Sequence, residues 1–152
     1  MRLDPTRLQV LRQLLILDSL PENRYDDLVR LLAEGLAVPI TLVNLLDADR
    51  DWFKATLGMP TRESAAATSF CEAFFHTADD IIVVEDTLLD ARFAEHPLVV
   101  GGPHIRFYGA ARLTVRGQTV GTLCAPTTRS PGACRQVNST SCVRSPEPRW
   151  NC

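Results

Sequence analysis

The chain opens with two segments in which apolar residues recur at helical spacing. The pattern predicts one helix over residues 5–18, where Pro5 after Asp4 suits a first helical turn. A second helix is predicted in NRYDDLVRLLAEGL, residues 23–36. Their expected apolar faces are Leu8, Leu11, Leu14 and Leu15 in the first helix, and Tyr25, Leu28, Leu31 or Leu32, and Leu36 in the second.

After the second helix the pattern changes to short apolar stretches bounded by polar turns, which is typical of strands. The predicted strands are residues 39–47, 51–58, 80–86, 105–115 and 118–125. Residues 69–77 and 90–99 are predicted to be short helices, and residues 59–68 a loop. Because neighbouring strands form hairpins, we expect an α+β fold: an antiparallel sheet of about five to six strands with helices packed against it.

Composition narrows the possible functions. The 152 residues suit a single domain, with 45% hydrophobic and 22% charged residues. The net charge is −2, and the basic stripe of a nucleic-acid binder is missing. No apolar run approaches the roughly 20 residues that cross a bilayer, and the N-terminus lacks a signal-peptide pattern. The sequence therefore predicts a cytoplasmic protein with no nucleic-acid or membrane partner.

Motifs for catalysis and metal binding are missing from the sequence. The five cysteines are an odd number without a CxxC pair, which argues against a disulfide framework or a zinc knuckle. His76, His96 and His104 lack the spacing of metal ligands. There is no glycine-rich phosphate loop, no GxSxG and no HExxH, so we expect no hydrolase, transferase or kinase activity.

Several segments resemble one known family when they are taken in order. ILDSLPENRYDDLVRLLAEGLAVPITLVNLLD is followed by TSFC, VVEDTLLDARFAEHPLV, IRFYGAARL and GTLC. Over residues 3–124 this order resembles GAF domains that are fused to bacterial histidine kinases or diguanylate cyclases. The resemblance implies an antiparallel sheet with helices on one face, and a pocket between the sheet and the connections that follow the second strand.

The resemblance also implies a function. It indicates a regulatory module in bacterial signal transduction that has no catalysis of its own. Such a module binds a small ligand of unknown identity or a partner domain, for instance a kinase or diguanylate cyclase output domain. No cofactor is indicated, and a homodimer remains one option.

Eight residues are the candidates for a ligand site. Six of them also have a structural interpretation: the two cysteines and Trp52 as core residues, Asp86 and Arg92 as parts of a loop held by local hydrogen bonds and a weak ion pair with Asp90, and Arg106 as a surface charge. Arg106 and Tyr108 would share a strand face. The predicted ligand-binding set is Trp52, Phe70, Cys71, Asp86, Arg92, Arg106, Tyr108 and Cys124.

The cysteines support an alternative function, either a redox sensor or an enzyme similar to free methionine sulfoxide reductases. Such an enzyme needs a nucleophilic and a resolving cysteine. Cys71 and Cys124 are the candidates. Cys71 follows the predicted helix start at Ser69, where the helix dipole lowers a thiol pKa, so we expect Cys71 to react faster than Cys124.

Residues 125–152 form an irregular tail with several prolines and no helical stripe, so we expect disorder or a reading-frame shift. The resemblance implies a long amphipathic helix at this point. In the shifted frame, each new codon consists of the third base of one codon and the first two bases of the next. A serine with a TCN codon is then replaced by Phe, Leu, Ile or Val, and a cysteine or tryptophan is replaced by Leu, Met or Val. One permitted reading is TDHALPGRLPPGELDLVRSLARTALEL, which has apolar residues at helical spacing. The hypothesis is that the domain's C-terminal helix is missing because of this shift.

Overall fold

The computed structural model describes residues 1–129, so most of the predicted irregular tail lies outside the described residues. Its centre is a six-stranded sheet in the order β3-β2-β1-β6-β5-β4. All of its pairings are antiparallel, as the hairpin pattern predicted. The strands are β1 (Thr41–Leu46), β2 (Arg50–Leu57), β3 (Glu63–Ala65), β4 (Ile81–Val84), β5 (Phe107–Val115) and β6 (Gln118–Thr127).

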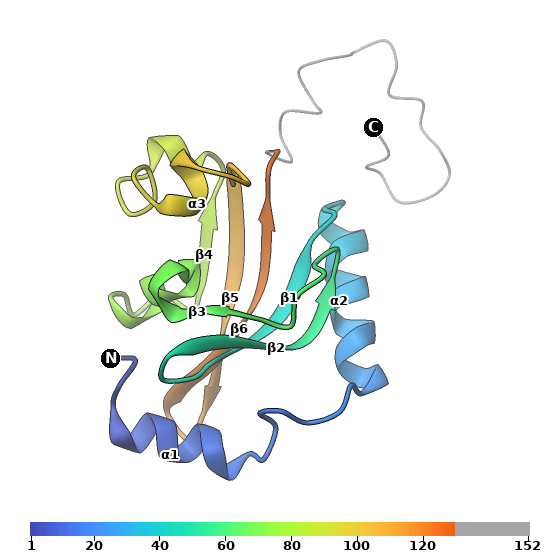
Figure 1. Ribbon diagram of the computed structural model, residues 1–152, viewed down its shortest axis with the longest axis vertical. Helices are drawn as coiled ribbons and strands as arrows, with labels where there is room; N and C mark the ends of the chain where they lie inside the picture. The colour runs from blue at the N-terminus through green and yellow to red at the C-terminus, as the bar shows by residue number, and fades with distance from the viewer. Residues whose placement is uncertain (130–152) are drawn as a thin grey trace.

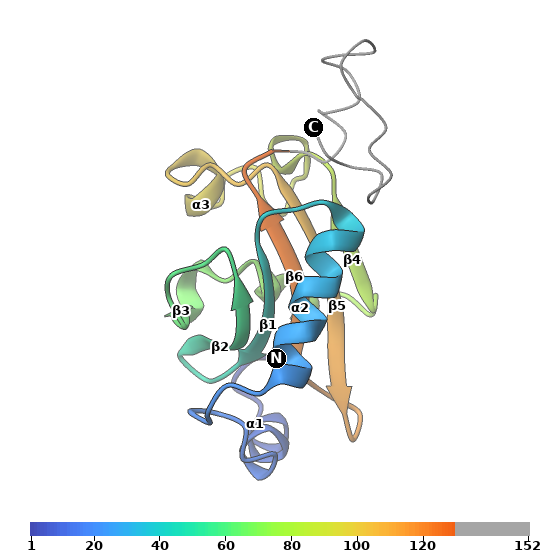
Figure 2. The ribbon, with the colours of Figure 1, turned by 90° about the vertical axis from the view of Figure 1, so that its right-hand side faces the viewer.

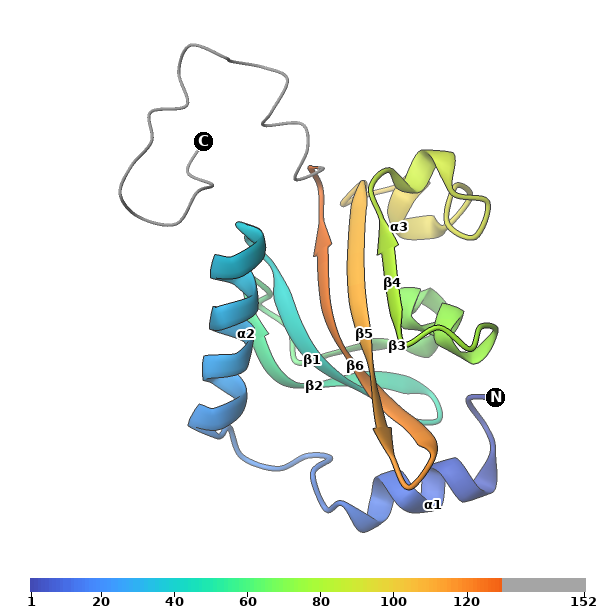
Figure 3. The same ribbon diagram turned by 180° about the vertical axis from the view of Figure 1, so that it is seen from behind.

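The helices lie on both faces of the sheet and at one end (Figures 1 and 3). The long helix α2 packs on one face, along β1 and β2. The opposite face carries short helical turns in the connections to β4 and β5, and α1 closes one end. The helical elements are α1 (Pro5–Gln13), α2 (Asn23–Leu36), η1 (Ala66–Thr68), η2 (Phe70–Phe75), η3 (Thr87–Leu89) and α3 (Pro97–Val100).

The first helix is shorter than its leucine pattern predicted. α1 ends at Gln13 rather than at residue 18, and Leu15 takes a left-handed conformation with a φ of 52°. Leu15 is 84% exposed, so this leucine has no core to pack against. The chain turns here because the segment that follows must return along the sheet to α2.

The second helix has the predicted bounds, but its buried side differs from the predicted apolar face. Val29 and Ala33 are buried, and Tyr25 of the predicted face packs against the same cluster, whereas Leu28, Leu31 and Leu36 are exposed. The smaller side chains let α2 approach the sheet closely, and the hydroxyl of Thr41 donates to the carbonyl of residue 29 at 2.7 Å. The leucines therefore flank the contact and do not make it.

Four further elements differ from the predicted ones. The loop predicted over residues 59–68 contains the edge strand β3, which pairs with β2. Residues 69–77 form a 3-10 helix over 70–75, not an α-helix, and only residues 97–100 of the predicted helix 90–99 are α-helical. The last strand, β6, continues to Thr127, beyond the predicted end at residue 125.

A buried lysine secures the connection between α1 and α2. Lys54 lies at the irregularity where Val43 pairs with Ala55 and Asn44 with Phe53, and its side chain is fully buried. Its Nζ donates to the Ser19 hydroxyl at 2.7 Å and to the Leu20 carbonyl at 2.6 Å, and it forms an ion pair with Glu22 at 2.7 Å. These contacts satisfy the buried ammonium and hold residues 19–22 against β2.

Substitution by alanine is expected to have opposite effects at two glycines, Gly121 in the sheet and Gly35 in α2. A Cβ on Gly121 would lie 2.2 Å from the carbonyl oxygen of Asn44, whereas one on Gly35 of α2 would meet nothing within 4 Å. We expect Gly121→Ala to lower the free energy of unfolding by about 1–3 kcal/mol through overpacking. We expect Gly35→Ala to raise it by about 0.5–1 kcal/mol through helix propensity. Urea unfolding of both variants measures this, and a stable Gly121→Ala protein would contradict the close β1–β6 approach.

Candidate functional site

A buried polar cluster around Cys71 lies between the sheet and η2. The hydroxyl of Tyr108 donates to the Cys71 sulfur at 3.1 Å, and the Asn44 amide donates to it at 3.3 Å. The hydroxyl of Thr122 is 3.0 Å from the same sulfur. These partners come from β5, β1 and β6, so three strands converge on one sulfur atom. Donors of this kind stabilise a thiolate more than a thiol.

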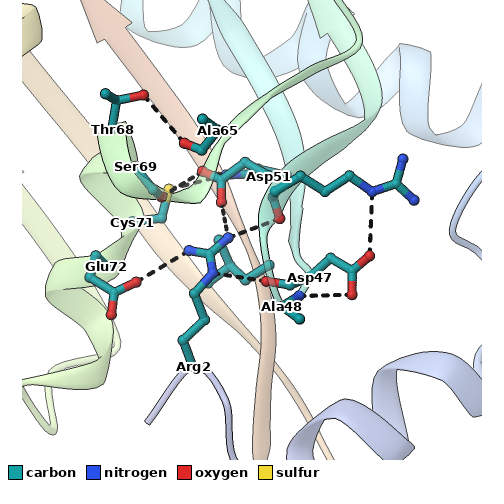
Figure 4. A network of polar contacts seen from close by, with 12 residues as sticks. Arg2, Asp47, Ala48, Asp51, Ala65, Thr68, Ser69, Cys71 and Glu72 are labelled. Atoms are coloured by element: carbon teal, nitrogen blue, oxygen red, sulfur yellow. Dashed lines mark hydrogen bonds and ion pairs between the residues drawn. The ribbon is translucent and has the colours of Figure 1, made fainter.

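The cluster continues from Cys71 to a buried ion pair (Figure 4). The second amide hydrogen of Asn44 is directed to a carboxylate oxygen of Asp51 at 2.9 Å, and Ser69 donates to the same oxygen at 2.5 Å. The other Asp51 oxygen forms an ion pair with Arg2, and both side chains are less than one-tenth exposed. Because the carboxylate has a cation and two neutral hydrogen-bond donors as partners, the free-energy cost of burying its charge is compensated.

Two arginines connect this cluster to α1. Arg2 also donates to the carbonyls of Asp47 at 2.8 Å and Arg50 at 2.9 Å, at the β1–β2 turn. Arg7 of α1 donates to the Arg2 carbonyl at 2.9 Å and to the Leu46 carbonyl at 2.7 Å. Burial, followed by the charge of Arg2, lowers the pKa of Arg7. A continuous set of hydrogen bonds therefore runs from Cys71 to the first helix.

The two buried cysteines have pKa values that shift in opposite directions. Hydrogen bonding with the Cys124 thiol, and then with Thr122 and Tyr108, lowers the pKa of Cys71 against the effect of burial. The pKa of Cys124 is raised well above its usual value, first by that same hydrogen bond and then by burial. Of the two sulfurs, Cys71 is therefore the one that carries negative charge more readily.

Aromatic rings fill the space next to the Cys71 cluster. Phe70 stacks on Phe93 with ring centroids 5.0 Å apart, and its ring lies 5.1 Å from Tyr108. His96 contacts Phe70 at a centroid distance of 4.2 Å, and burial lowers its pKa, which favours the neutral ring. His96 Nδ1 accepts from the Leu98 amide at 3.1 Å. These side chains occupy the region where a pocket was expected, on the side of the sheet that faces η2 and α3.

The structure brings together four of the eight predicted site residues and separates the other four. Phe70, Cys71, Tyr108 and Cys124 belong to one buried cluster. Trp52 is buried on the opposite side, with Val10, Leu11, Leu45 and Val120, so it does not join the site. The remaining three, Asp86, Arg92 and Arg106, lie in the connection between β4 and β5 or at its end.

These three residues stabilise that connection through local contacts. Asp86 caps η3 by accepting from the Leu88 amide at 3.0 Å. Arg92 forms a surface ion pair with Asp90 at 2.7 Å. Arg106 donates to the Val99 carbonyl at 2.9 Å. Arg92 thus braces Asp90, whereas Arg106 is partly buried and bonded to backbone carbonyls, so it is not simply a surface charge.

Asn44, Asp51 and Arg2 complete the cluster, and none of the three was predicted from the sequence. Asn44 could have been recognised from the sequence, because an amide side chain within the apolar run PITLVNLL needs buried hydrogen-bond partners. Its Oδ1 has no hydrogen-bond partner among the described residues. Asp51 and Arg2 are separated by 49 positions, and only the fold brings them into contact. Ser69, predicted as a helix cap, makes no cap bond and donates to Asp51 instead.

Residues 1–129 show neither a cluster of metal-ligating side chains nor a helix that could span a membrane. No three histidine, cysteine or acidic side chains in this part of the chain converge in a way that could hold a metal ion. None of its helices has the length and apolar composition to cross a membrane. A shallow groove lies elsewhere, on the outer side of α1, lined by Leu3, Pro5, Leu8, Gln9, Arg12, Gln13 and Leu15.

The geometry defines a small α+β domain whose antiparallel sheet has a buried polar centre on one face, and comparisons assign its family. The family model for the GAF domain matches residues 20–139. The chain belongs to the GAF domain family, as the order of its sequence segments indicated.

A known relative supports this family assignment. The chain is 34% identical over 113 residues to a cyclic di-GMP phosphodiesterase of Pseudomonas aeruginosa. This match covers 74% of the chain but 19% of the relative, so the chain spans about a fifth of that protein's length.

Solved structures show the fold. A type II free methionine-R-sulfoxide reductase from Thermoplasma acidophilum matches with a TM-score of 0.55 and 11% identity, over 80% of this chain and 79% of that one. The GAF domain of an Acinetobacter phosphoenolpyruvate-protein phosphotransferase also has a TM-score of 0.55, with 16% identity, over 84% of this chain and 80% of that one. At these identities the likeness concerns the fold alone.

The opposite pKa shifts predict different reactivity for the two thiols. We expect iodoacetamide to modify Cys71 before Cys124 in the native protein, because the thiolate is the reactive form and the lowered pKa of Cys71 makes its rate begin to increase at a lower pH than that of Cys124. Tyr108→Phe removes one donor to the sulfur and should slow the reaction of Cys71 at pH 7.5 by up to about tenfold. Tyr25→Phe on α2 is the matched control and should leave the rate unchanged. Mass spectrometry of each cysteine peptide gives the rates, and equal rates for the two thiols would contradict the prediction.

Proposed function

We propose that this domain is a regulatory module without catalysis of its own, which responds to a small ligand and controls an attached output domain. The observation that carries the proposal is the hydrogen-bonded path from Cys71 through Asn44 and Asp51 to Arg2 and Arg7. A regulatory domain needs a site and a transmission element that respond together. Here the site lies under the sheet and the element is α1.

The ligand site in this proposal is the aromatic cluster beside Cys71. Phe70, Phe93 and Tyr108 offer ring faces, and the polar atoms of Cys71 and Asn44 lie at their inner end. A mainly apolar ligand with a planar group and one hydrogen-bond donor fits this lining, because the Asn44 Oδ1 lacks a donor. Binding would require the segment before β5 to move away from the sheet.

The attached domain is inferred from the relative. The phosphodiesterase is about five times longer than the matched region, so other parts of that protein accompany its similar segment. We infer that this domain likewise acts on an enzyme domain of a signalling protein. The domain itself contributes binding and a conformational change, and the chemistry belongs to the partner.

A ligand screen tests this site. Native mass spectrometry of the purified chain, followed by a thermal-shift screen, should identify a compound bound once per chain. Hydrogen exchange should then show protection of residues 69–75 and 86–106 together with α1. Tyr108→Phe should weaken binding by up to about tenfold, and Tyr25→Phe should not. Protection confined to the groove on the outer side of α1 would contradict the proposed site.

A second candidate function is a thiol redox sensor, and the placement of Cys71 and Cys124 in the same buried cluster favours it. In this scheme the Cys71 thiolate attacks one oxygen of hydrogen peroxide and breaks the O–O bond, which gives a sulfenic acid and, after proton transfer to the leaving hydroxide, releases water. The Cys124 thiol then attacks the sulfenic sulfur, forming a disulfide and releasing a second water. A methionine sulfoxide as the oxidant would give the corresponding reductase, with methionine as the product.

Peroxide titration separates the redox function from ligand binding. We expect substoichiometric hydrogen peroxide to produce a Cys71–Cys124 disulfide, seen as the loss of two hydrogens from the joined peptides. Cys71→Ser should abolish this product, while Cys124→Ser should leave a sulfenic acid that dimedone traps. Formation of disulfides only with cysteines of the tail, or no reaction while the fold is intact, would remove the redox function and leave the ligand proposal standing.

A further inference from the structure

A row of side chains crosses the α2 face of the sheet at right angles to the strands. The pairing register places Val43, Leu123, Ala111 and Ile81 side by side on β1, β6, β5 and β4. Val43 packs with Val29 of α2 and is 2% exposed, whereas Ile81 at the far end of the row is 65% exposed. Burial on this face therefore decreases with distance from α2.

The exposed apolar side chains of this face lie on β4, and further exposed apolar side chains lie on α2. Val83, two positions after Ile81, shares its side of β4 and is 59% exposed. Leu28 and Leu31 lie one turn apart on α2 and are both exposed. Figure 2 shows α2 in front of the sheet, with β5 and β4 beside it and no helix of the described residues over them. Adjacent exposed apolar side chains of this kind indicate a surface that another element covers.

We propose that an amphipathic helix encoded in the shifted reading frame after β6 covers this face, and that the printed tail is the product of that shift. β6 lies between the strands under α2 and the open strands β5 and β4. A segment that turned back after Thr127 would therefore run along the open face. β6 has 10 residues, or about 33 Å, and a helix of about 20 residues has a similar length. Residues 130–152 correspond to such a segment.

The codons of the tail favour a helix in the shifted frame. As printed, residues 130–152 contain three prolines and no apolar stripe. In the shifted frame, the positions of Ser141, Cys142, Ser145 and Cys152 each become Leu, Ile, Val, Phe or Met, if the serines have TCN codons. These four positions fall within an arc of about 100° on a helix, and Ser139 and Trp150, which become apolar by the same rule, widen the apolar side to about half of the helix circumference. This inference is independent of the proposed function.

The nucleotide sequence of the gene is the first test. We expect it to continue without a stop codon in the shifted frame through the codons for residues 128–152, and to encode apolar residues at the four positions. A stop codon in this frame, or polar residues at these positions, would overturn the proposal before any protein is made.

The second test compares two proteins: the 152-residue chain with the sequence printed above (the printed chain), and a variant whose gene has one nucleotide inserted after codon 127, so that translation continues in the shifted frame (the restored chain). We expect the restored chain to unfold at a higher urea concentration and to show slower hydrogen exchange in β4 and β5. Val83→Lys should destabilise the restored chain and have little effect on the printed one. Leu89→Lys is the matched control, because Leu89 is 86% exposed on η3, and it should affect neither chain.

A third test supplies the helix separately. A synthetic peptide with the restored sequence should bind the printed 152-residue chain, and Val83→Lys should weaken binding by about tenfold or more, whereas a scrambled peptide should not bind. Two other occupants of the face would overturn the proposal. A dimer of the printed chain that Val83→Lys disrupts would assign the face to a second copy. A loss of stability when residues 130–152 are removed from the printed chain would assign it to the tail as printed.

Discussion

The buried carboxylate of Asp51 is the constraint around which this domain is arranged. A carboxylate without partners costs several kcal/mol to bury, so each neighbouring element must supply a donor. Arg2 supplies a cation from the N-terminal segment, Asn44 an amide from β1, and Ser69 a hydroxyl from the start of η2. The positions of the N-terminal segment, the β1–β2 hairpin and η2 are thereby fixed relative to one another. Because Asn44 is shared with the sulfur of Cys71, the same interaction also fixes the thiol.

This arrangement gives the two faces of the sheet different roles. The face under η2 contains the polar centre and the aromatic rings, so a change at Cys71 alters the partners of Asp51. The other face is packed by α2 through small residues, and Lys54 holds the preceding connection to β2. α1 touches both systems, because Arg7 bonds to the Arg2 carbonyl while Leu11 packs with Trp52. Events on the polar face can therefore reach the helices without a large rearrangement of the sheet.

Much of the architecture could be predicted, because it depends on local patterns. The bounds of α2, the two hairpins and the antiparallel sheet follow from helical periodicity and from short apolar runs between turns. Local patterns were wrong where a distant partner decides the outcome. The leucines of α2 were the expected contact, yet Val29 and Ala33 pack on the sheet because close approach requires small side chains. Leu14 and Leu15 continued the stripe of the first helix, yet α1 ends before them because nothing packs there.

The sequence by itself determined the fold class and the family, and it proposed eight site residues, of which the structure places Phe70, Cys71, Tyr108 and Cys124 in one buried cluster. Apolar periodicity and the order of motifs are properties of the chain, so no tertiary information was needed. Only the tertiary structure decided that Trp52 faces away from that cluster and that Asp51 meets Arg2 across 49 positions. The sequence had favoured Cys71 as the thiol with the lower pKa because of a helix dipole, and only the tertiary structure supplied a different cause: hydrogen bonds from residues on β1, β5 and β6 set the charge that this buried sulfur can carry.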